Sequence, residues 1–201
     1  MVGAAKHINT SLYIKMANVE AAFRNLHQDL LDGCKEGDQK AQFQIYKLYY
    51  KAMYNTSLRI VNDTMEAEDI MQESFLSAFE KIDTYSGTVS FGAWLKKIVV
   101  NRSLDALNKR KAVFEDIDTH IGIKDESSED SEKTENIDTR VEEVKKAIER
   151  LPDGYRVILS LYLLEGYDHD EIAEILSINS STSRSQLSRA KQKLISELQE
   201  K

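Results

Sequence analysis

Hydrophobic residues recur at helical spacing through most of the first half of the chain. Across 66–82 the apolar positions return every three to five residues, and acidic and amide side chains line the other side of the predicted helix. The same kind of pattern predicts a helix over 92–109 and a largely buried helix over 41–61. Because 83–90 contains Gly and Ser, we expect a connecting loop there. Together these segments predict a helical N-terminal module over 20–112.

The end of the chain predicts a second helical module, over 140–201. Its expected helices cover 141–151, 155–164, 169–176 and the segment from 180 onward. Pro152 interrupts the first of them. Asp168, with Glu171 three residues later, has the pattern of a capping box, and Asn179 can cap the last helix.

Short helices, a tight turn and a basic final helix make the helix-turn-helix arrangement, whose second helix fits the major groove of DNA. Arg184, Ser185, Ser188 and Arg189 form one exposed strip on the predicted helix, and apolar residues fall on its other side. Arginine reads guanine and glutamine reads adenine, whereas serine and lysine mostly bind phosphates. The pattern favours a DNA-binding helix; an ordinary amphipathic terminal helix with a basic face is the alternative.

Charge is distributed unevenly along the chain. The 201 residues carry 27 Lys and Arg against 34 Asp and Glu, a net charge of −7. Segment 115–135 holds nine acidic and two basic residues, which account for that whole excess, whereas 92–111 has six basic residues against one acidic residue. The stretch ESSEDSEKTE has no apolar side chain and cannot bury enough surface to offset its ordering entropy. We therefore expect a flexible acidic linker over 113–139; a solvated loop without a partner is the alternative.

Composition excludes several classes of protein. One Pro and eight Gly disfavour a hairpin-rich β fold, so the expected fold class is all-α. No segment reaches the ~20 apolar residues of a membrane helix, and the N-terminus lacks a signal-peptide pattern, which predicts a cytoplasmic protein. Cys34 is the single cysteine and is expected to be a passive thiol. The sequence shows no pattern for a metal, a cofactor or a catalytic residue, and His169 is expected to be a solvated surface side chain.

Four motifs resemble a known family. The pair AEDIMQESFLSAF (67–79) and FGAWLKKIVVNRSLDAL (91–107) is similar to region 2 of bacterial sigma-70-family factors. The pair LPDGYRVILSLYLLEGYDHDEIAEIL (151–176) and STSRSQLSRAKQKL (181–194) is similar to region 4. Because a short linker joins only these two regions, the chain resembles the extracytoplasmic-function (ECF) subgroup. Residues 1–19 match nothing in this family, and Met16 is a candidate alternative start.

The resemblance implies partners and roles. Region 2 of such factors binds the clamp helices of core RNA polymerase, here through Asp69, Gln72 and Glu73, and captures a flipped base of the −10 promoter element. Region 4 reads the −35 element as duplex DNA, and the linker threads a polymerase channel. The implied −10 residues are Tyr85, Phe91, Trp94, Lys96, Lys97, Asn101 and Arg102. The implied −35 residues are Thr182, Arg184, Ser185, Gln186, Ser188, Arg189 and Lys191. An anti-sigma factor is an implied further partner.

Some positions depart from the family pattern or leave alternatives open. Ser177 stands at the helix-turn-helix corner, where the family usually has Gly, and Ser181-Thr182-Ser183 stands where it usually has Gly-Thr-Val. Gln186 and Ser188 replace residues that are often basic or aromatic, so base preference at −35 is not carried over from relatives. For Phe91 and Trp94, packing in the hydrophobic core is the alternative to stacking on a base. Two other functions remain open at this point: a dimeric regulator that uses only the helix-turn-helix, and a helical adaptor that binds no DNA.

Overall fold

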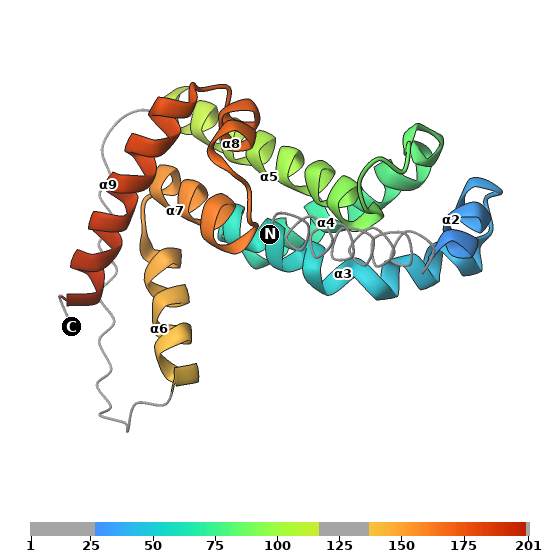
Figure 1. Cartoon of the computed structure of the whole chain (residues 1–201), viewed down its shortest axis with the longest axis horizontal. Coiled ribbons are helices and arrows are strands. Elements are labelled where there is room, and N and C mark those ends of the chain that lie inside the picture. Colours follow the sequence, from blue (N-terminus) through green and yellow to red (C-terminus); the bar gives the residue numbers. More distant parts are fainter. Residues whose placement is uncertain (1–26, 117–136, 200–201) are drawn as a thin grey trace, which may run out of the picture. The chain divides into compact units, whose positions relative to one another are not determined.

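A computed structural model describes residues 27–116 and 137–199, and over these ranges the chain forms helices and no β-strand (Figure 1). The expected all-α fold class is therefore confirmed. None of the described helices has the length and apolar character needed to cross a bilayer. The candidate start Met16, the unassigned segment 1–19 and the greater part of the expected linker lie outside the described residues.

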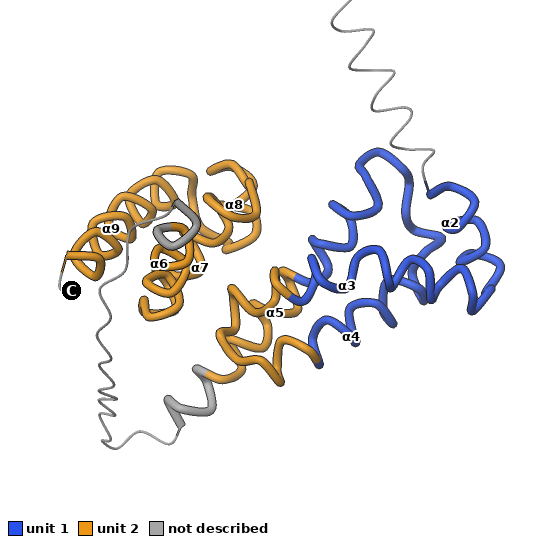
Figure 2. The backbone as a smooth tube through the Cα atoms, turned by 90° about the horizontal axis from the view of Figure 1, so that it is seen from below, with its two compact units in different colours: residues 1–54, 69–99 blue, residues 55–68, 100–201 orange. Residues whose placement is uncertain are grey.

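The chain divides into two compact units, which Figure 2 colours separately. The first unit comprises Met1–Tyr54 and Asp69–Val99. Its elements are α2 (Gln28–Lys35), most of α3 (Gln39–Val61) and of α4 (Thr64–Glu80), η1 (Ile82–Thr84) and the first turns of α5 (Phe91–Asp116).

Aromatic rings fill much of the first unit's core. Tyr46 meets Phe75 edge-to-face with ring centroids 5.0 Å apart, and Tyr49 meets Phe91 in the same way at 5.5 Å. Such edge-to-face pairs add stabilisation beyond the burial of their area. At Gly92, an added Cβ would lie 2.9 Å from the Tyr49 ring, so α5 needs a glycine there to come this close to α3. The predicted inward face of α5 is therefore the face that closes this core.

The second unit comprises Asn55–Glu68 and Val100–Lys201. Its C-terminal elements are α6 (Ile137–Arg150), α7 (Asp153–Leu159), the π-helical turn η2 (Ser160–Leu164), α8 (His169–Leu176) and α9 (Ser180–Gln199). α9 packs against α6, α7 and α8. Among the apolar residues that the periodicity places inward, Ile172, Leu187, Ala190 and Leu194 are buried, whereas Ala173 and Leu176 of α8 are half-buried.

Helix bounds differ from the sequence predictions in two places. α5 continues to Asp116 and α6 begins at Ile137, so both helices enter the segment 113–139 that was expected to be linker. The predicted helix 155–164 is divided, because α7 ends at Leu159 and the π-helical turn follows. In that turn the Glu165 amide donates to the Ser160 carbonyl at 2.9 Å, a spacing of five residues rather than four.

Candidate nucleic-acid interface

The turn between α8 and α9 is held by backbone and side-chain caps. Asp168 Oδ1 accepts hydrogen bonds from the amides of Asp170 and Glu171, both at 2.8 Å, and Glu171 Oε2 accepts from the Asp168 amide. This confirms the predicted capping box. At the other end of α8, Ser177 adopts the left-handed conformation (φ 54°, ψ 42°), and the Ile178 amide donates to the Ala173 carbonyl. The left-handed φ explains why a glycine suits this corner.

The first turn of α9 is held by a side-chain cap at its surface and by a polar contact on its buried side. Asn179 Oδ1 accepts from the Thr182 amide at 2.7 Å, which confirms the predicted cap. Ser183 is fully buried, and its Oγ lies 2.9 Å from Nδ1 of His169. The expectation that His169 is merely solvated is therefore wrong: its ring is half-buried, bonds to α9 and stacks on Tyr162 with centroids 4.9 Å apart. Sequence reasoning missed this pair because the two residues are 14 positions apart.

Outward from these caps, α9 presents the predicted polar strip to solvent. Arg184, Ser185, Ser188 and Arg189 are exposed. Lys191 is exposed as well, and its ammonium lies 5.4 Å from the centre of the Tyr162 ring. The other two predicted −35 residues, Thr182 and Gln186, are half-buried. A rigidly capped helix thus carries two arginines on the side opposite its buried Leu and Ala residues.

An acidic and amide face runs along α4. Asp69, Gln72 and Glu73 are all exposed, on the face of this helix opposite its core residues. Leu76 continues the same face and is 64% exposed, which is high for a leucine among polar neighbours. Sequence reasoning did not select Leu76, although its spacing from Gln72 and Glu73 was a usable signal.

The three predicted −10 aromatics lie together, Tyr85 within the loop 83–90 and the other two in the first turn of α5. The Tyr85 ring is 5.6 Å from Phe91 and 5.5 Å from Trp94, measured between centroids, and Phe91 and Trp94 are 5.6 Å apart. Phe91 is only 4% exposed, so its surroundings favour the core alternative. Tyr85 and Trp94 are half-buried, and the Tyr85 hydroxyl donates to the Val89 carbonyl at 2.7 Å. A base could therefore reach the edges of Tyr85 and Trp94 but not the face of Phe91.

The predicted −10 cations and amide follow on α5. Lys97 and Asn101 are exposed and, being four residues apart, share a face of the helix. Lys96 and Arg102 are half-buried. α5 therefore presents a basic and amide side that suits a phosphate backbone.

Three groups among the described residues have raised pKa values, and one of them is Tyr49, whose pKa is raised by burial and, to a smaller extent, by the nearby Tyr85. Burial, reinforced by the nearby carboxylates of Glu165 and Glu171, raises the pKa of Tyr167 to about 12. Burial, with a smaller effect of Asp38, raises the pKa of the Cys34 thiol. A buried thiol that keeps its proton reacts slowly, which fits the passive role expected of Cys34.

Two family models match the chain. Residues 45–113 match the model described as Sigma-70 region 2, and residues 141–194 match the model described as Sigma-70, region 4. The first range holds the α4 face and the aromatic cluster, and the second holds the helix-turn-helix and most of α9.

Curated relatives and solved structures agree with these matches. The chain is 30% identical over 152 residues to the ECF RNA polymerase sigma factor SigM of Bacillus subtilis, covering 75% of this chain and 91% of the relative. It is 28% identical over 181 residues to SigW of the same organism, with 83% and 93% of the two chains covered. The sigma factor RpoE of Bartonella quintana, solved with the anti-sigma factor NepR, is similar in fold at a TM-score of 0.56 and 23% identity, covering 78% of this chain and 95% of that one. The sequence, the two family matches and these relatives together show that the chain belongs to the sigma-70 family, in its extracytoplasmic-function subgroup.

Proposed function

We propose that this protein is an ECF sigma factor that binds core RNA polymerase, recognises the −10 and −35 elements of its promoters and promotes DNA opening. Membership of the family already supports a role in transcription initiation. In this proposal the protein is a specificity subunit and performs no chemistry of its own. The observation that carries the proposal is the exposed polar strip of α9, held by caps at the helix-turn-helix corner.

The geometry of α9 supports the proposed −35 contact. A capped helix of this kind enters the major groove with its N-terminal residues toward the bases. Arg184 and Arg189 are exposed there, five residues apart, and each can donate a bidentate pair to guanine. Ser185, Ser188 and Lys191 are placed to bind phosphates, while Thr182 lies at the start of the helix.

The α4 face is the proposed contact with core polymerase. Asp69, Gln72 and Glu73 are exposed together and offer two carboxylates and an amide to a basic partner. Leu76 adds an exposed apolar side chain to the same face, whose burial by a partner would contribute to binding. The proposed partner is the pair of clamp helices of the polymerase.

The −10 contact is proposed for the loop 83–90 and α5. Extruding a base from the stack costs a few kcal/mol, which stacking and hydrogen bonds in a pocket must offset. Tyr85 and Trp94 supply partly exposed ring surface, and Asn101 supplies an amide for hydrogen bonding. Lys96, Lys97 and Arg102 would hold the backbone of the single strand.

The division into modules remains a proposal. The N-terminal module over 20–112 would bind polymerase and the −10 element, and the C-terminal module over 140–201 would bind the −35 element. The acidic segment 113–139 would pass through the positively charged path of the template and RNA in the polymerase. An anti-sigma factor is a further proposed partner.

Run-off transcription with bacterial core polymerase tests the proposed function. Adding the chain should give a promoter-dependent product, and the triple variant Asp69→Ala, Gln72→Ala, Glu73→Ala should abolish co-elution with polymerase. Lys40→Ala, an exposed change elsewhere on the same unit, is the matched control and should retain full activity. Tight binding of the chain alone to a palindromic duplex would instead indicate a stand-alone dimeric regulator. No promoter-dependent product at any ratio of the chain to core polymerase would contradict the proposal.

A further inference from the structure

A serine occupies a buried position in the first turn of α9. Ser183 is fully buried, although the family pattern has an apolar valine at this position. A buried hydroxyl costs free energy unless it finds a hydrogen-bond partner. In this chain the partner is Nδ1 of His169 at the start of α8, 2.9 Å from the Ser183 Oγ. A polar contact therefore joins the two helices of the helix-turn-helix at a place where the family pattern has an apolar residue.

The ring of His169 is itself held in one orientation. His169 is the first residue of α8, and the capping box of Asp168 and Glu171 fixes the backbone at this point. Its ring stacks on that of Tyr162 in η2, with the centroids 4.9 Å and the planes 26° apart. Because both the backbone and the ring are held, Nδ1 meets the hydroxyl of Ser183 in a defined direction.

The Tyr162 ring also contacts α9 directly. The ammonium of Lys191, about two turns after Ser183, lies 5.4 Å from the centre of this ring, within the range of a cation–π contact. One stack of two rings thus contacts α9 at both 183 and 191. We call Tyr162, His169, Ser183 and Lys191 the α9 anchor. Between its two contacts on the helix lie the exposed side chains of the proposed reading strip, Arg184, Ser185, Ser188 and Arg189.

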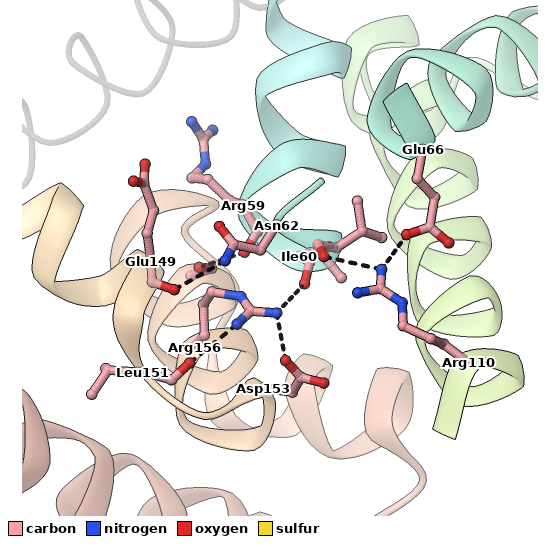
Figure 3. Close-up of polar contacts among 11 residues, drawn as sticks. Arg59, Ile60, Asn62, Glu66, Arg110, Glu149, Leu151, Asp153 and Arg156 are labelled. Atoms are coloured by element: carbon pink, nitrogen blue, oxygen red, sulfur yellow. Dashed lines mark hydrogen bonds and ion pairs between the residues drawn. The ribbon is translucent and has the colours of Figure 1, made fainter. Parts of the chain in front are cut away.

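α7, against which α9 packs, is held by contacts of its own (Figure 3). Arg156 of α7 is buried, and its Nη1 donates to the carbonyl of Leu151 at 3.1 Å and its Nη2 to Asp153 Oδ1 at 2.7 Å. Both partners lie within five positions of Arg156 in the sequence, so these bonds fix the start of α7 independently of α9. α9 therefore packs on a support that is already ordered, and its own contacts decide how it is turned on that support.

Apolar packing and the α9 anchor act differently on this turn. Leu187, Ala190 and Leu194 bury one side of α9, and the hydrophobic contribution depends on the area buried and not on direction. A hydrogen bond, in contrast, weakens steeply as its angle changes. A small rotation of α9 about its axis thus keeps most of the apolar burial but loses the hydrogen bond of the anchor. The anchor therefore restricts the direction in which the arginines of α9 leave the helix.

We propose that His169 is a positioning residue for −35 recognition, which acts through Ser183 to fix the direction in which α9 presents Arg184 and Arg189 to the bases. Bidentate reading of a base by arginine depends on direction, whereas contacts with phosphates carry no sequence information. Loss of the anchor therefore lowers discrimination between sequences more than it lowers affinity for DNA in general. The inference rests on the proposed function and deepens it, because it assigns −35 specificity partly to residues outside the reading strip.

Selection from a promoter library randomised over the −35 element, with each variant chain bound to core polymerase, tests the proposal. Ser183→Ala removes the hydroxyl, and His169→Phe keeps a ring on Tyr162 but removes Nδ1. Each should lower the preference for the best sequence over single mismatches by about fivefold, while affinity for the mismatched sequences changes little. His169→Asn should restore most of the preference, because its amide can bond to the hydroxyl from the position of Nδ1.

The double variant His169→Phe, Ser183→Ala separates positioning from stability. It leaves no unsatisfied polar partner, so its melting temperature should be close to that of the wild type. Its preference should nevertheless fall no further than in either single variant, because all three lack the same hydrogen bond. Ser180→Ala is the matched control: it is the same substitution in the same turn of α9, but the Ser180 hydroxyl donates to Asp170 at a site open to water, which replaces the lost bond. This control should keep the wild-type preference.

A double variant with the wild-type preference, a loss that is uniform over all sequences, or a His169→Asn chain no better than His169→Phe would each overturn the proposal. If the wild-type chain with core polymerase selects no −35 sequence, the proposed function fails instead. Hydrogen exchange of the free chain then still tests the anchor. Ser183→Ala should speed amide exchange at residues 183–187, and Ser180→Ala should not. Equal exchange in these two variants would show that the hydrogen bond does not hold α9.

Discussion

Two parts of the molecule carry residues predicted to contact DNA, and the structure treats them differently. In the aromatic cluster of Tyr85, Phe91 and Trp94, the rings contact one another, and one of them is buried. On α9 the predicted readers Arg184 and Arg189 face solvent, while the helix is anchored by other residues. Aromatic residues serve both stacking on bases and packing in a core, so their presence alone does not separate the two roles. The exposed arginines of α9 are not needed for the core, because Leu187, Ala190 and Leu194 supply the buried face of that helix.

The largest expected effect tests whether Phe91 of the aromatic cluster is a core residue. Phe91→Ala should lower the free energy of unfolding by about 3–5 kcal/mol, because it removes a buried ring and leaves a cavity. Urea denaturation followed by circular dichroism measures this change. Phe43→Ala, at a ring that is 58% exposed on α3, is the matched control and should cost less than about 0.5 kcal/mol. Equal losses in the two variants would show that Phe91 is not a core residue.

The second prediction concerns the reading strip. Arg189→Ala, and separately Arg184→Ala, should weaken promoter binding of the polymerase complex by about 1–3 kcal/mol at one base position, while the melting temperature stays that of the wild type. Competition between promoters altered one base pair at a time locates the affected position. Arg150→Ala, an exposed arginine on α6, is the control and should leave binding unchanged. A loss that is uniform over all sequences would reassign the arginine to phosphate binding.

Much of the fold was predictable because its signals are local. The capping box of Asp168 and Glu171 and the cap at Asn179 depend on residues two or three positions apart, and both are confirmed. The buried face of α9 follows from helical spacing for the same reason. The contacts that were not predicted join distant positions, such as Arg59 with Glu165. Periodicity says which side of a helix is buried but not which polar group of another helix it meets, so a buried carboxylate cannot be told from a solvated one.

The site was predictable to a smaller extent than the fold. Exposure along α9 and α4 agrees with the predicted faces, because amphipathic helices turn their polar side outward. The roles of individual side chains depend on three-dimensional neighbours, as His169 and Phe91 show. His169 stood next to a cap in the sequence and looked solvated, yet it bonds to the buried Ser183. The assignment of each residue to −10, −35 or polymerase remains a prediction.

A third prediction concerns Ser177, at the helix-turn-helix corner that orients α9. Ser177→Gly should raise the free energy of unfolding by about 0.5–1 kcal/mol, because glycine adopts the left-handed conformation without a steric penalty. The same substitution at Ser196, inside α9, should lower it by about 1 kcal/mol. Thermal and urea denaturation of the two variants should therefore change in opposite directions. A destabilised Ser177→Gly chain would mean that the serine side chain contributes more at this corner than its backbone strain costs.

The smallest effect concerns Tyr167, between η2 and α8. Its pKa is raised to about 12 in the folded chain, above the ordinary value of 10.0, because burial and the carboxylates of Glu165 and Glu171 disfavour the phenolate. The neutral phenol is thus preferred in the fold, so its contribution to stability is fully present below pH 10 and is lost as the pH rises toward 12. Melting temperatures of the wild type and of Tyr167→Phe, measured from pH 8 to pH 12, should run parallel up to about pH 10 and converge or cross above it. Since the charge of Glu165 supplies part of this shift, Glu165→Gln should weaken the pH dependence. Curves that stay parallel to pH 12 would show that the fold tolerates the phenolate of Tyr167.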